Sequence, residues 1–230
     1  MKGFFTILCL WAGLHSWAQV TIGVKLSNPL SSTSIITVPK ATVPYDIETF
    51  AYLGVLQGGA FVRVPFSRHF TFHGETLFRT ESVSFSPRGA NWFPSERHLY
   101  LFKYLNIPLL LQCEGTNKFR GFGQLGIAPK FLGEAILYDK EEDKNFDVTK
   151  HFNRAVLDLN VGGGILWDLP RVVFMIDGRL SVNLTPMASK RSMKYLDFRD
   201  ARSIHVAISA SAGLKIGKRN TNNKKPIINN

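Results

Sequence analysis

Apolar and polar side chains alternate along most of this chain after residue 19. A β-strand turns successive side chains to opposite faces, so this alternation predicts strands with one apolar and one polar face. Eight such segments can be distinguished, and they cover residues 20–27, 51–65, 70–81, 101–112, 119–137, 154–167, 172–184 and 203–216. In the fourth segment, Pro108 cannot donate to a strand ladder and predicts a bulge or a local break. The fifth is rich in glycine, so the phase of its alternation cannot be assigned.

The connections between these segments are alternately long and short. The long ones cover residues 28–49, 84–98, 139–153 and 185–202, and the short ones cover 67–69, 114–118 and 168–171. Tight turns on one side and large loops on the other are typical of a transmembrane β-barrel. Most segments also reach the roughly 9–11 residues that a tilted membrane-spanning strand needs. We therefore expect an all-β fold: an eight-stranded, antiparallel, up-and-down transmembrane β-barrel with both ends on the short-turn, periplasmic side.

The first eighteen residues have the pattern of a secretory signal peptide. Lys2 provides the positive charge, residues 4–12 form an apolar core, and Ser16-Trp17-Ala18 is a small-residue cleavage motif. We expect export with cleavage between Ala18 and Gln19. Removal of this segment leaves Cys113 as the single cysteine, so no intrachain disulfide can form. The predicted domains are a signal peptide at 1–18, an outer-membrane barrel at 19–217 and a basic, disordered periplasmic tail at 218–230.

The chain is basic, with 28 Lys and Arg against 17 Asp and Glu. Such a surface suits outer-membrane lipid and lipopolysaccharide, which we expect as partners. No aromatic–basic motif, zinc-ligand spacing or helix-turn-helix pattern is present in the sequence, so nucleic acid is not an expected partner. The sequence also contains no recognisable cofactor or metal motif.

The polar faces of the strands carry charged side chains, which a barrel with an apolar outer surface places in its lumen. The predicted lumen residues are Lys25, Arg63, His73, Glu75, Arg79, Glu81, Asn106, Asp158, Asp177, Arg179 and His205. The interior of an eight-stranded barrel is just wide enough for side chains to fill. Because charges withdrawn from water must be paired and hydrogen-bonded, we expect a polar network that plugs the lumen.

Two residue pairs are candidates for catalysis: His73 with Glu75, and His205 with Ser209. Residues two or four apart in a strand share a face, but acid–base chemistry also needs hydrogen-bond contact and an opening for substrate. No nucleophile elbow or histidine–serine motif of a barrel enzyme is present in the sequence. We therefore expect no enzymatic activity.

Four short stretches resemble the PorT-like family of outer-membrane β-barrel proteins. They lie at residues 72–78, 104–111, 122–129 and 177–184, and the resemblance spans about residues 20–217. It implies an outer-membrane location and, by the family's name, a link to protein secretion. Such a barrel would be inserted by the outer-membrane insertion machinery and would present extracellular loops to protein partners. Asn106 stands where the family has a glutamate, which removes one charge from the lumen.

Two other functions fit the same pattern. A narrow channel, or a barrel that binds lipid or a small ligand, would need a lumen that side chains do not fill. A soluble carrier of the lipocalin kind would show the same alternation with the faces exchanged, apolar inside and polar outside. We expect instead a structural or interaction role through the extracellular loops.

Overall fold

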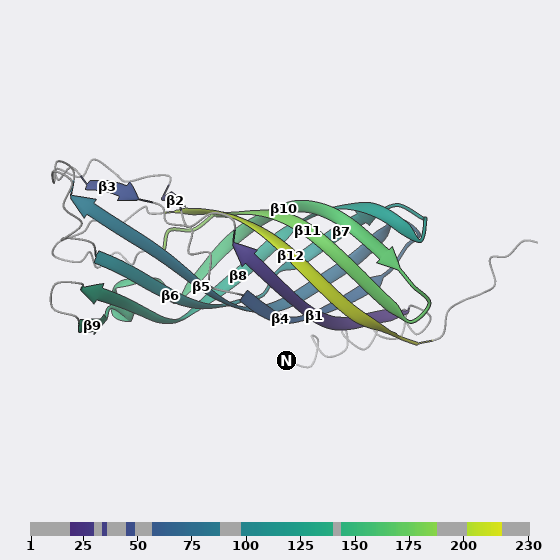
Figure 1. Cartoon of the computed structure of the whole chain (residues 1–230), viewed down its shortest axis with the longest axis horizontal. Helices are drawn as coiled ribbons and strands as arrows, with labels where there is room; N and C mark the ends of the chain where they lie inside the picture. The colour runs from purple at the N-terminus through teal and green to yellow at the C-terminus, as the bar shows by residue number, and fades with distance from the viewer. Residues whose placement is uncertain are drawn as a thin grey trace, which may run out of the picture.

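The computed structural model describes residues 19–29, 34–35, 45–48, 57–87, 98–139, 144–187 and 202–217. It confirms the predicted fold, a closed antiparallel barrel of eight strand positions (Figure 1). The sheet closes because β1 pairs with both β4 and β12. The barrel strands are β1 (Val20–Pro29), β4 (Gln57–Pro65), β5 (Phe70–Pro87), β6 (His98–Asn106) with β7 (Leu109–Glu114), β8 (Phe119–Asp139), β10 (Ala155–Asp168), β11 (Val172–Asn183) and β12 (Ser203–Ile216). The predicted signal peptide at 1–18, the tail at 218–230 and the first part of the second predicted strand, 51–56, lie outside the described residues.

One of the eight strand positions is interrupted at Ile107 and Pro108, which separate β6 from β7. Both parts pair with β5 on one side and with β8 on the other, so together they act as a single strand. The ladder bridges the break, because the Glu75 N–H donates to the Pro108 carbonyl and the Ile107 N–H donates to the Pro129 carbonyl, each at 2.9 Å. The local break predicted at Pro108 is therefore present, and it does not open the barrel wall.

Several strands continue beyond the barrel on the long-loop side (Figure 1). β5 and β8 run for 18 and 21 residues. β3 (Tyr45–Glu48) pairs with the end of β5, β9 (Lys144–Asp147) pairs with the end of β8, and the short β2 (Ser34–Ile35) pairs with β12. The predicted connections at 28–49, 84–98 and 139–153 are thus too long, since strand structure occupies part of each and a 3-10 helix (Thr149–His151) occupies part of the last. After Glu81, serines alternate with Val83 and Phe85, so the strand pattern continues and β5 is longer than the predicted segment 70–81.

This loop-side extension has an apolar core of its own. Phe102 on β6 lies edge-on to Phe152, with ring centroids 4.8 Å apart and an interplanar angle of 81°. The neighbouring Thr149 is tied to β8, because its hydroxyl accepts a hydrogen bond from the Ala135 N–H at 2.9 Å. The buried members of this core are Tyr100, Phe102, Tyr104, Leu132, Ala135, Val148, Phe152 and Met187. They hold the segment that follows β9 against the ends of β6 and β8.

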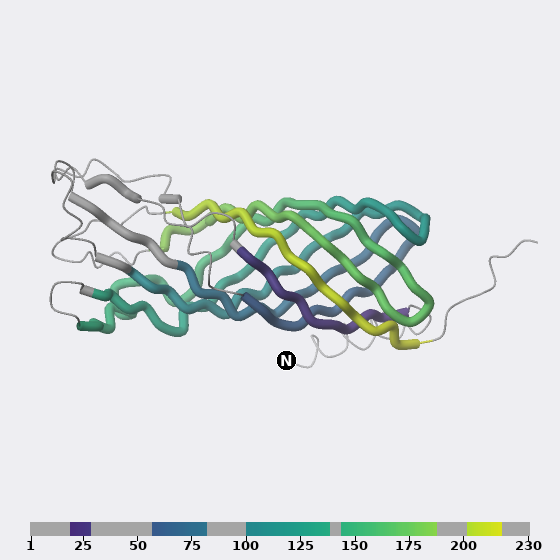
Figure 2. The backbone as a smooth tube through the Cα atoms, viewed as in Figure 1, coloured from purple at the N-terminus to yellow at the C-terminus, as the bar shows by residue number. Residues whose placement is uncertain are grey.

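At the opposite end of the barrel, short turns at 66–69, 115–118 and 169–171 join the inclined strands (Figure 2). Val20 at the start of β1 pairs with Ile216 at the end of β12, so the first strand begins and the last strand ends on this turn side. The predicted short connections need one correction, because Glu114 and Asp168 are the last residues of β7 and β10 rather than turn residues. None of the helical residues in the described ranges forms a segment with the length and hydropathy of a membrane-spanning helix.

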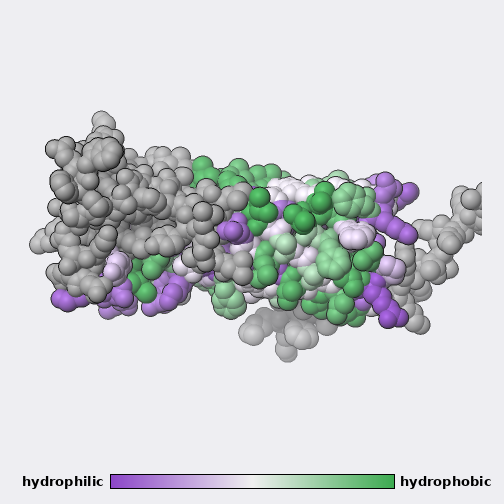
Figure 3. All heavy atoms as spheres, viewed as in Figure 1, coloured by the Kyte–Doolittle hydropathy of each residue, from purple (hydrophilic) through white to green (hydrophobic). Residues whose placement is uncertain are grey.

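The outer surface of the barrel is apolar and its interior carries the charges. The outward Phe78 is 70% exposed and Val24 is 64% exposed, whereas the inward Lys25 is only 2% exposed. Figure 3 shows hydrophobic side chains in a band over the barrel strands, with hydrophilic side chains gathered at the turn end. A soluble carrier barrel has the reverse arrangement, so this distribution excludes the lipocalin-like alternative. Exposed aromatic side chains lie along part of the turn-side edge of the band, as in membrane barrels: Phe66, Phe70, Phe119, Trp167 and Phe174.

Candidate functional site

The structure places all eleven side chains that were predicted to face the lumen inside the barrel, and none of them is more than 7% exposed. β8 contributes further buried polar side chains, Gln124 and Lys130. With the apolar residues between them, these side chains form four layers along the barrel. From the short turns to the long loops, the layers are a turn-side ion cluster, an apolar layer, a central ion cluster and a loop-side ion cluster.

The turn-side ion cluster lies where the strands meet the short turns. Its members are Arg63, Glu114, Arg120, Asp168 and Lys215. Glu114 binds Arg63 with one oxygen, and its Oε2 lies 2.8 Å from Arg120 Nη2. The same Arg120 reaches Asp168 Oδ2 at 2.8 Å, and Asp168 also binds Lys215. Each carboxylate therefore contacts two cations, and the chain of contacts links β4, β7, β8, β10 and β12.

An apolar layer lies next to this cluster, toward the middle of the barrel. It consists of Phe61, Phe122, Leu166, Val173 and Met175. Leu166 and Val173 are completely shielded from solvent, at 0% exposure. On β11, Val173 and Met175 come before the ionic residue Asp177, so the layer lies between the depths of the two clusters. Two buried glutamines still join the clusters beside it: Arg63 Nε donates to Gln112 Oε1 at 3.1 Å, Gln112 Nε2 to Gln124 Oε1 at 3.0 Å, and Gln124 Nε2 to Asp177 Oδ1 at 3.2 Å. The lumen-facing positions of the strands therefore include these five apolar side chains as well as the predicted charged ones.

The central ion cluster joins opposite walls of the barrel. Lys25 Nζ lies 2.9 Å from Glu75 Oε1 and 2.8 Å from Asp177 Oδ2. The Arg179 guanidinium donates two hydrogen bonds of 2.7 Å to the two oxygens of Glu75. His73 Nε2 is 2.9 Å from the same carboxylate. Bidentate arginine–carboxylate pairs are among the strongest charge-assisted contacts, so Glu75 is the residue on which this cluster depends.

The loop-side ion cluster is centred on Lys130, whose side chain is 0% exposed. The ammonium lies 3.3 Å from Glu81 Oε1 and 3.1 Å from Asp158 Oδ2, and it donates to Asn183 Oδ1 at 3.0 Å. It also stands over the ring of Tyr104, 5.1 Å from the centroid, in a cation–π contact. Arg79 Nε lies 2.9 Å from Glu81, which gives this layer two cations and two carboxylates.

Several buried polar atoms of this loop-side layer have no hydrogen-bond partner among the described residues. They are Arg79 Nη2, Glu81 Oε2, Asn106 Oδ1, Asp158 Oδ1 and Asn183 Nδ2. Buried polar groups in proteins almost always have a partner, either protein or ordered water. Donors and acceptors occur together here, which is the combination that suits water. The central cluster also contains such atoms, namely His73 Nδ1 and Arg179 Nε, so neither cluster is fully satisfied by the described protein groups.

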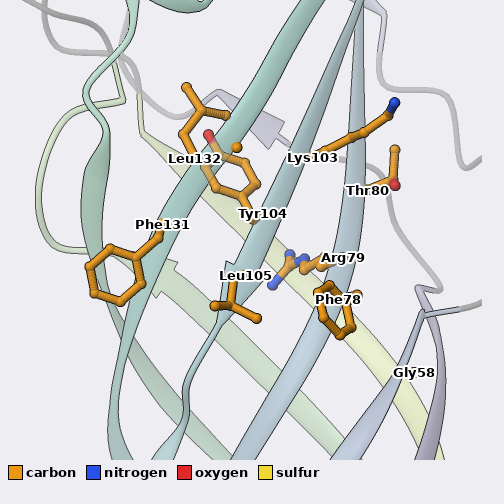
Figure 4. Close-up of a pocket in the computed structure, with 10 residues that line it drawn as sticks. Gly58, Phe78, Arg79, Thr80, Lys103, Tyr104, Leu105, Phe131 and Leu132 are labelled. Carbon is orange, nitrogen blue, oxygen red and sulfur yellow. The ribbon is translucent and has the colours of Figure 1, made fainter.

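A groove of about 460 Å³ lies on the outer face of the wall, over β5, β6 and β8 (Figure 4). Phe78, Leu105 and Phe131 are cross-strand neighbours and form a row on its apolar side. The next row toward the loops is polar, with Lys103 Nζ 2.7 Å from Glu134 Oε2. The apolar belt of the barrel therefore ends between these two rows.

Two glycines leave the space that forms this groove. Lys103 pairs with Glu134 but Tyr104 pairs with Leu132, so Gly133 is the extra residue of a bulge on β8. Gly58 on β4 lies opposite Phe78 on β5 and likewise lines the groove. Both positions lack a side chain next to large outward rings, and the wall is hollowed there.

The sequence model of one protein family, described as outer membrane protein beta-barrel domain, matches residues 17–189. This match covers most of the chain. The protein belongs to the outer-membrane β-barrel domain family. Family membership agrees with the apolar belt and the closed eight-strand sheet, and it assigns the protein to the outer membrane.

Solved structures similar to this outer-membrane barrel are remote in sequence. The outer membrane protein OprG from Pseudomonas aeruginosa matches with a TM-score of 0.49 and 12% identity, over 89% of this chain and 98% of that one. The attachment invasion locus protein Ail of Yersinia pestis matches with a TM-score of 0.43 and 14% identity, over 86% and 97% of the two chains. No curated protein matches this sequence.

The structure brings together one of the two pairs considered for catalysis in this outer-membrane barrel. His73 contacts Glu75, but both are buried in the central cluster, and the Phe61 ring stacks on the imidazole with centroids 5.2 Å apart. His205 and Ser209 are four residues apart on β12, a separation of about 13 Å along a strand. The Ser209 hydroxyl instead donates to the hydroxyl oxygen of Ser27 at 3.1 Å. The described residues contain no cluster of three or more metal-ligating side chains.

Several lumen residues of this outer-membrane barrel were not predicted as such. Lys130 was missed because the glycines of the fifth segment obscured its phase, although it has the same parity as the buried Phe122 and Gln124. Glu114 and Asp168 were assigned to turns. In each case the two-residue alternation of the clear part of the strand continues to these residues and indicates that they face the lumen.

Proposed function

We propose that this outer-membrane barrel is non-conducting, with a lumen plugged by its own side chains, and that it acts through its surfaces rather than through transport. The central ion cluster supports this proposal most directly. β5 and β11 are four positions apart in the ring of eight strands, so the Glu75–Arg179 contact spans the full width of the lumen.

Energetic considerations favour a closed lumen. A solute that passes the central cluster must separate Lys25 and Arg179 from their carboxylates. Removal of one partner of a buried ion pair costs about 3–5 kcal/mol, because the other charge is left without compensation. At the depth of Phe61 and Phe122 the polar path narrows to the hydrogen-bonded amides of Gln112 and Gln124, which a passing ion would also have to separate.

We propose further that the role is structural or interaction-based and uses the long-loop side. The extension of β5, β6 and β8, with its own apolar core, provides a folded base there. All four side chains of β9 are exposed and available for contact. The resemblance to PorT-like proteins supports a link to protein secretion as part of this proposal. We also propose that residues 1–18 direct export, that the outer-membrane insertion machinery assembles the barrel, and that the protein has no enzymatic activity.

Conductance in a planar lipid bilayer tests the plugged lumen. The full mature chain is folded in detergent, and its folded state is verified by the different gel migration of unboiled and boiled samples. We expect no discrete current steps at moderate voltage. Steps that scale with the amount of folded protein would overturn the proposal and favour the alternative, a narrow channel.

A second experiment tests the cellular part of the proposal. Expression with the native residues 1–18 should place the protein in the outer-membrane fraction. Recovery in the soluble periplasm would contradict membrane insertion, and retention in the cytoplasm would contradict export by this segment.

A further inference from the structure

We propose that the groove beside Leu105 binds one acyl chain of lipopolysaccharide, with a phosphate of its lipid A on Lys103. The inference rests on the proposed orientation of the barrel, in which the long loops face the cell exterior. The groove lies at the loop-side edge of the apolar belt, so its occupant comes from the outer leaflet, where lipopolysaccharide is the phosphate-bearing lipid.

The shape and lining of the groove suit a single hydrocarbon chain. Phe78 and Phe131 stand on either side of Leu105, as their cross-strand register requires. Phe78 is 70% exposed and Phe131 is 45% exposed, so both rings project into the lipid rather than cover the space between them. In Figure 4 the three side chains lie in a row, with Thr80 and Lys103 on one side of it. A hydrocarbon chain that lies along this row contacts Phe78, Leu105 and Phe131.

The polar end of the groove suits a phosphate group. Lys103 is half-exposed, with 56% of its side chain accessible, at the boundary between the apolar and the polar row. Its ammonium has three N–H donors, and Glu134 accepts one of them at 2.7 Å. A lysine at this depth extends its charged end toward the head groups, where anionic lipid attracts it. The Thr80 side chain is in the same row and adds a hydroxyl.

Gly133 allows a direct test, because a side chain there fills the groove without disturbing the barrel. A Cβ at Gly133 would have the Lys103 carbonyl oxygen as its nearest neighbour at 3.6 Å, an ordinary van der Waals contact. Gly178 is a matched control: it is also an outward glycine on a barrel strand, and a Cβ there meets no atom within 4 Å. The pair G133L and G178L therefore adds the same side chain inside and outside the groove.

The experiment measures lipid retained by the full-length mature protein. Folded protein in detergent is mixed with lipopolysaccharide of short core and, separately, with phosphatidylglycerol at equal phosphate, and bound lipid per barrel is counted by native mass spectrometry. We expect wild type and G178L to retain lipopolysaccharide, and G133L to lose it at least five-fold. K103Q should lose retention to a smaller extent, whereas K150Q, which alters an exposed lysine of the 3-10 helix, should behave as wild type.

Three outcomes would overturn the inference. These are equal retention by G133L and G178L, no retention by wild type, or equal retention of phosphatidylglycerol, which would assign the groove to ordinary phospholipid. Boiled and unboiled gel migration establishes that each variant is folded. Conductance is measured on the same samples, and current steps would contradict the plugged lumen without affecting the lipid result, so the two proposals fail separately.

Discussion

Arg179 and Glu75 face each other across the barrel from opposite walls and share two parallel hydrogen bonds of 2.7 Å each. Lys25 binds the same carboxylate at 2.9 Å from a third strand. Glu75 thus contacts two buried cations, and Asp177 is the second carboxylate near both of them, 2.8 Å from Lys25 and 3.6 Å from Arg179.

We predict that E75Q destabilises the barrel by about 3–5 kcal/mol, because Arg179 is left as a buried charge without its bidentate partner. Urea unfolding in lipid vesicles, followed by tryptophan fluorescence, measures the change. E134Q is the control, since Glu134 forms its ion pair with Lys103 at the surface and such pairs contribute about 0.2–1 kcal/mol. Equal effects of the two substitutions would mean that the lumen is hydrated enough to screen the central cluster.

The apolar layer leads to a second prediction, for L166A. Leu166 is 0% exposed within the cluster of Phe61, Phe122, Val173 and Met175. Its truncation leaves a cavity in the lumen that the barrel wall cannot collapse to fill. We expect the free energy of unfolding to fall by about 2–5 kcal/mol in the same assay. L125A removes an equally large side chain from the lipid-facing surface, where Leu125 is 56% exposed. A larger loss for L125A than for L166A would contradict a dry, packed layer at this depth.

The sequence was sufficient to predict the eight strand positions of the barrel and most of their inward and outward residues, but not the short β2, β3 and β9. Along β11, for example, Asp177 and Arg179 alternate with Ile176 and Leu180, and the structure keeps that phase throughout. Register is strongly specified wherever the two faces differ this much, since a slip by one residue would turn charged side chains into the lipid. Strand ends were predicted less well, and the continuation of β5 to Pro87 is an example.

The pairing of charges could not be predicted from the sequence. Lys25 contacts Glu75, 50 residues away, and Asp177, 152 residues away. Which side chains meet depends on the width of the barrel and on the stagger of its strands, and local alternation contains neither quantity. The groove could not be predicted from the sequence either, because it depends on the bulge that makes Gly133 an extra residue of β8.

A third prediction tests the orientation of the outward face. Val161 is 45% exposed in the middle of β10, between Leu125 of β8 and Leu180 of β11. We expect V161R to destabilise the folded barrel in vesicles by about 2–4 kcal/mol, the cost of an arginine near the bilayer midplane. N145R places the same charge on the exposed β9, beyond the barrel, and should be neutral within about 0.5 kcal/mol. If both variants were neutral, the β10 surface would face water.

The last prediction concerns the close approach of β4 and β5. A Cβ added at Gly59 would lie 1.9 Å from the Thr76 carbonyl oxygen, well inside van der Waals contact, and that oxygen belongs to the backbone of the neighbouring strand. G59A therefore has to push β4 away from β5, and we expect a loss of at least about 1–3 kcal/mol, the usual cost of overpacking. The smaller yield of folded protein should be visible as a weaker fast-migrating band in unboiled gel samples. G178A adds the same methyl group where no atom lies within 4 Å, and it should fold like wild type. Equal folding yields for the two alanine variants would show that β4 and β5 lie further apart at Gly59 than their register with Thr76 and Leu77 indicates.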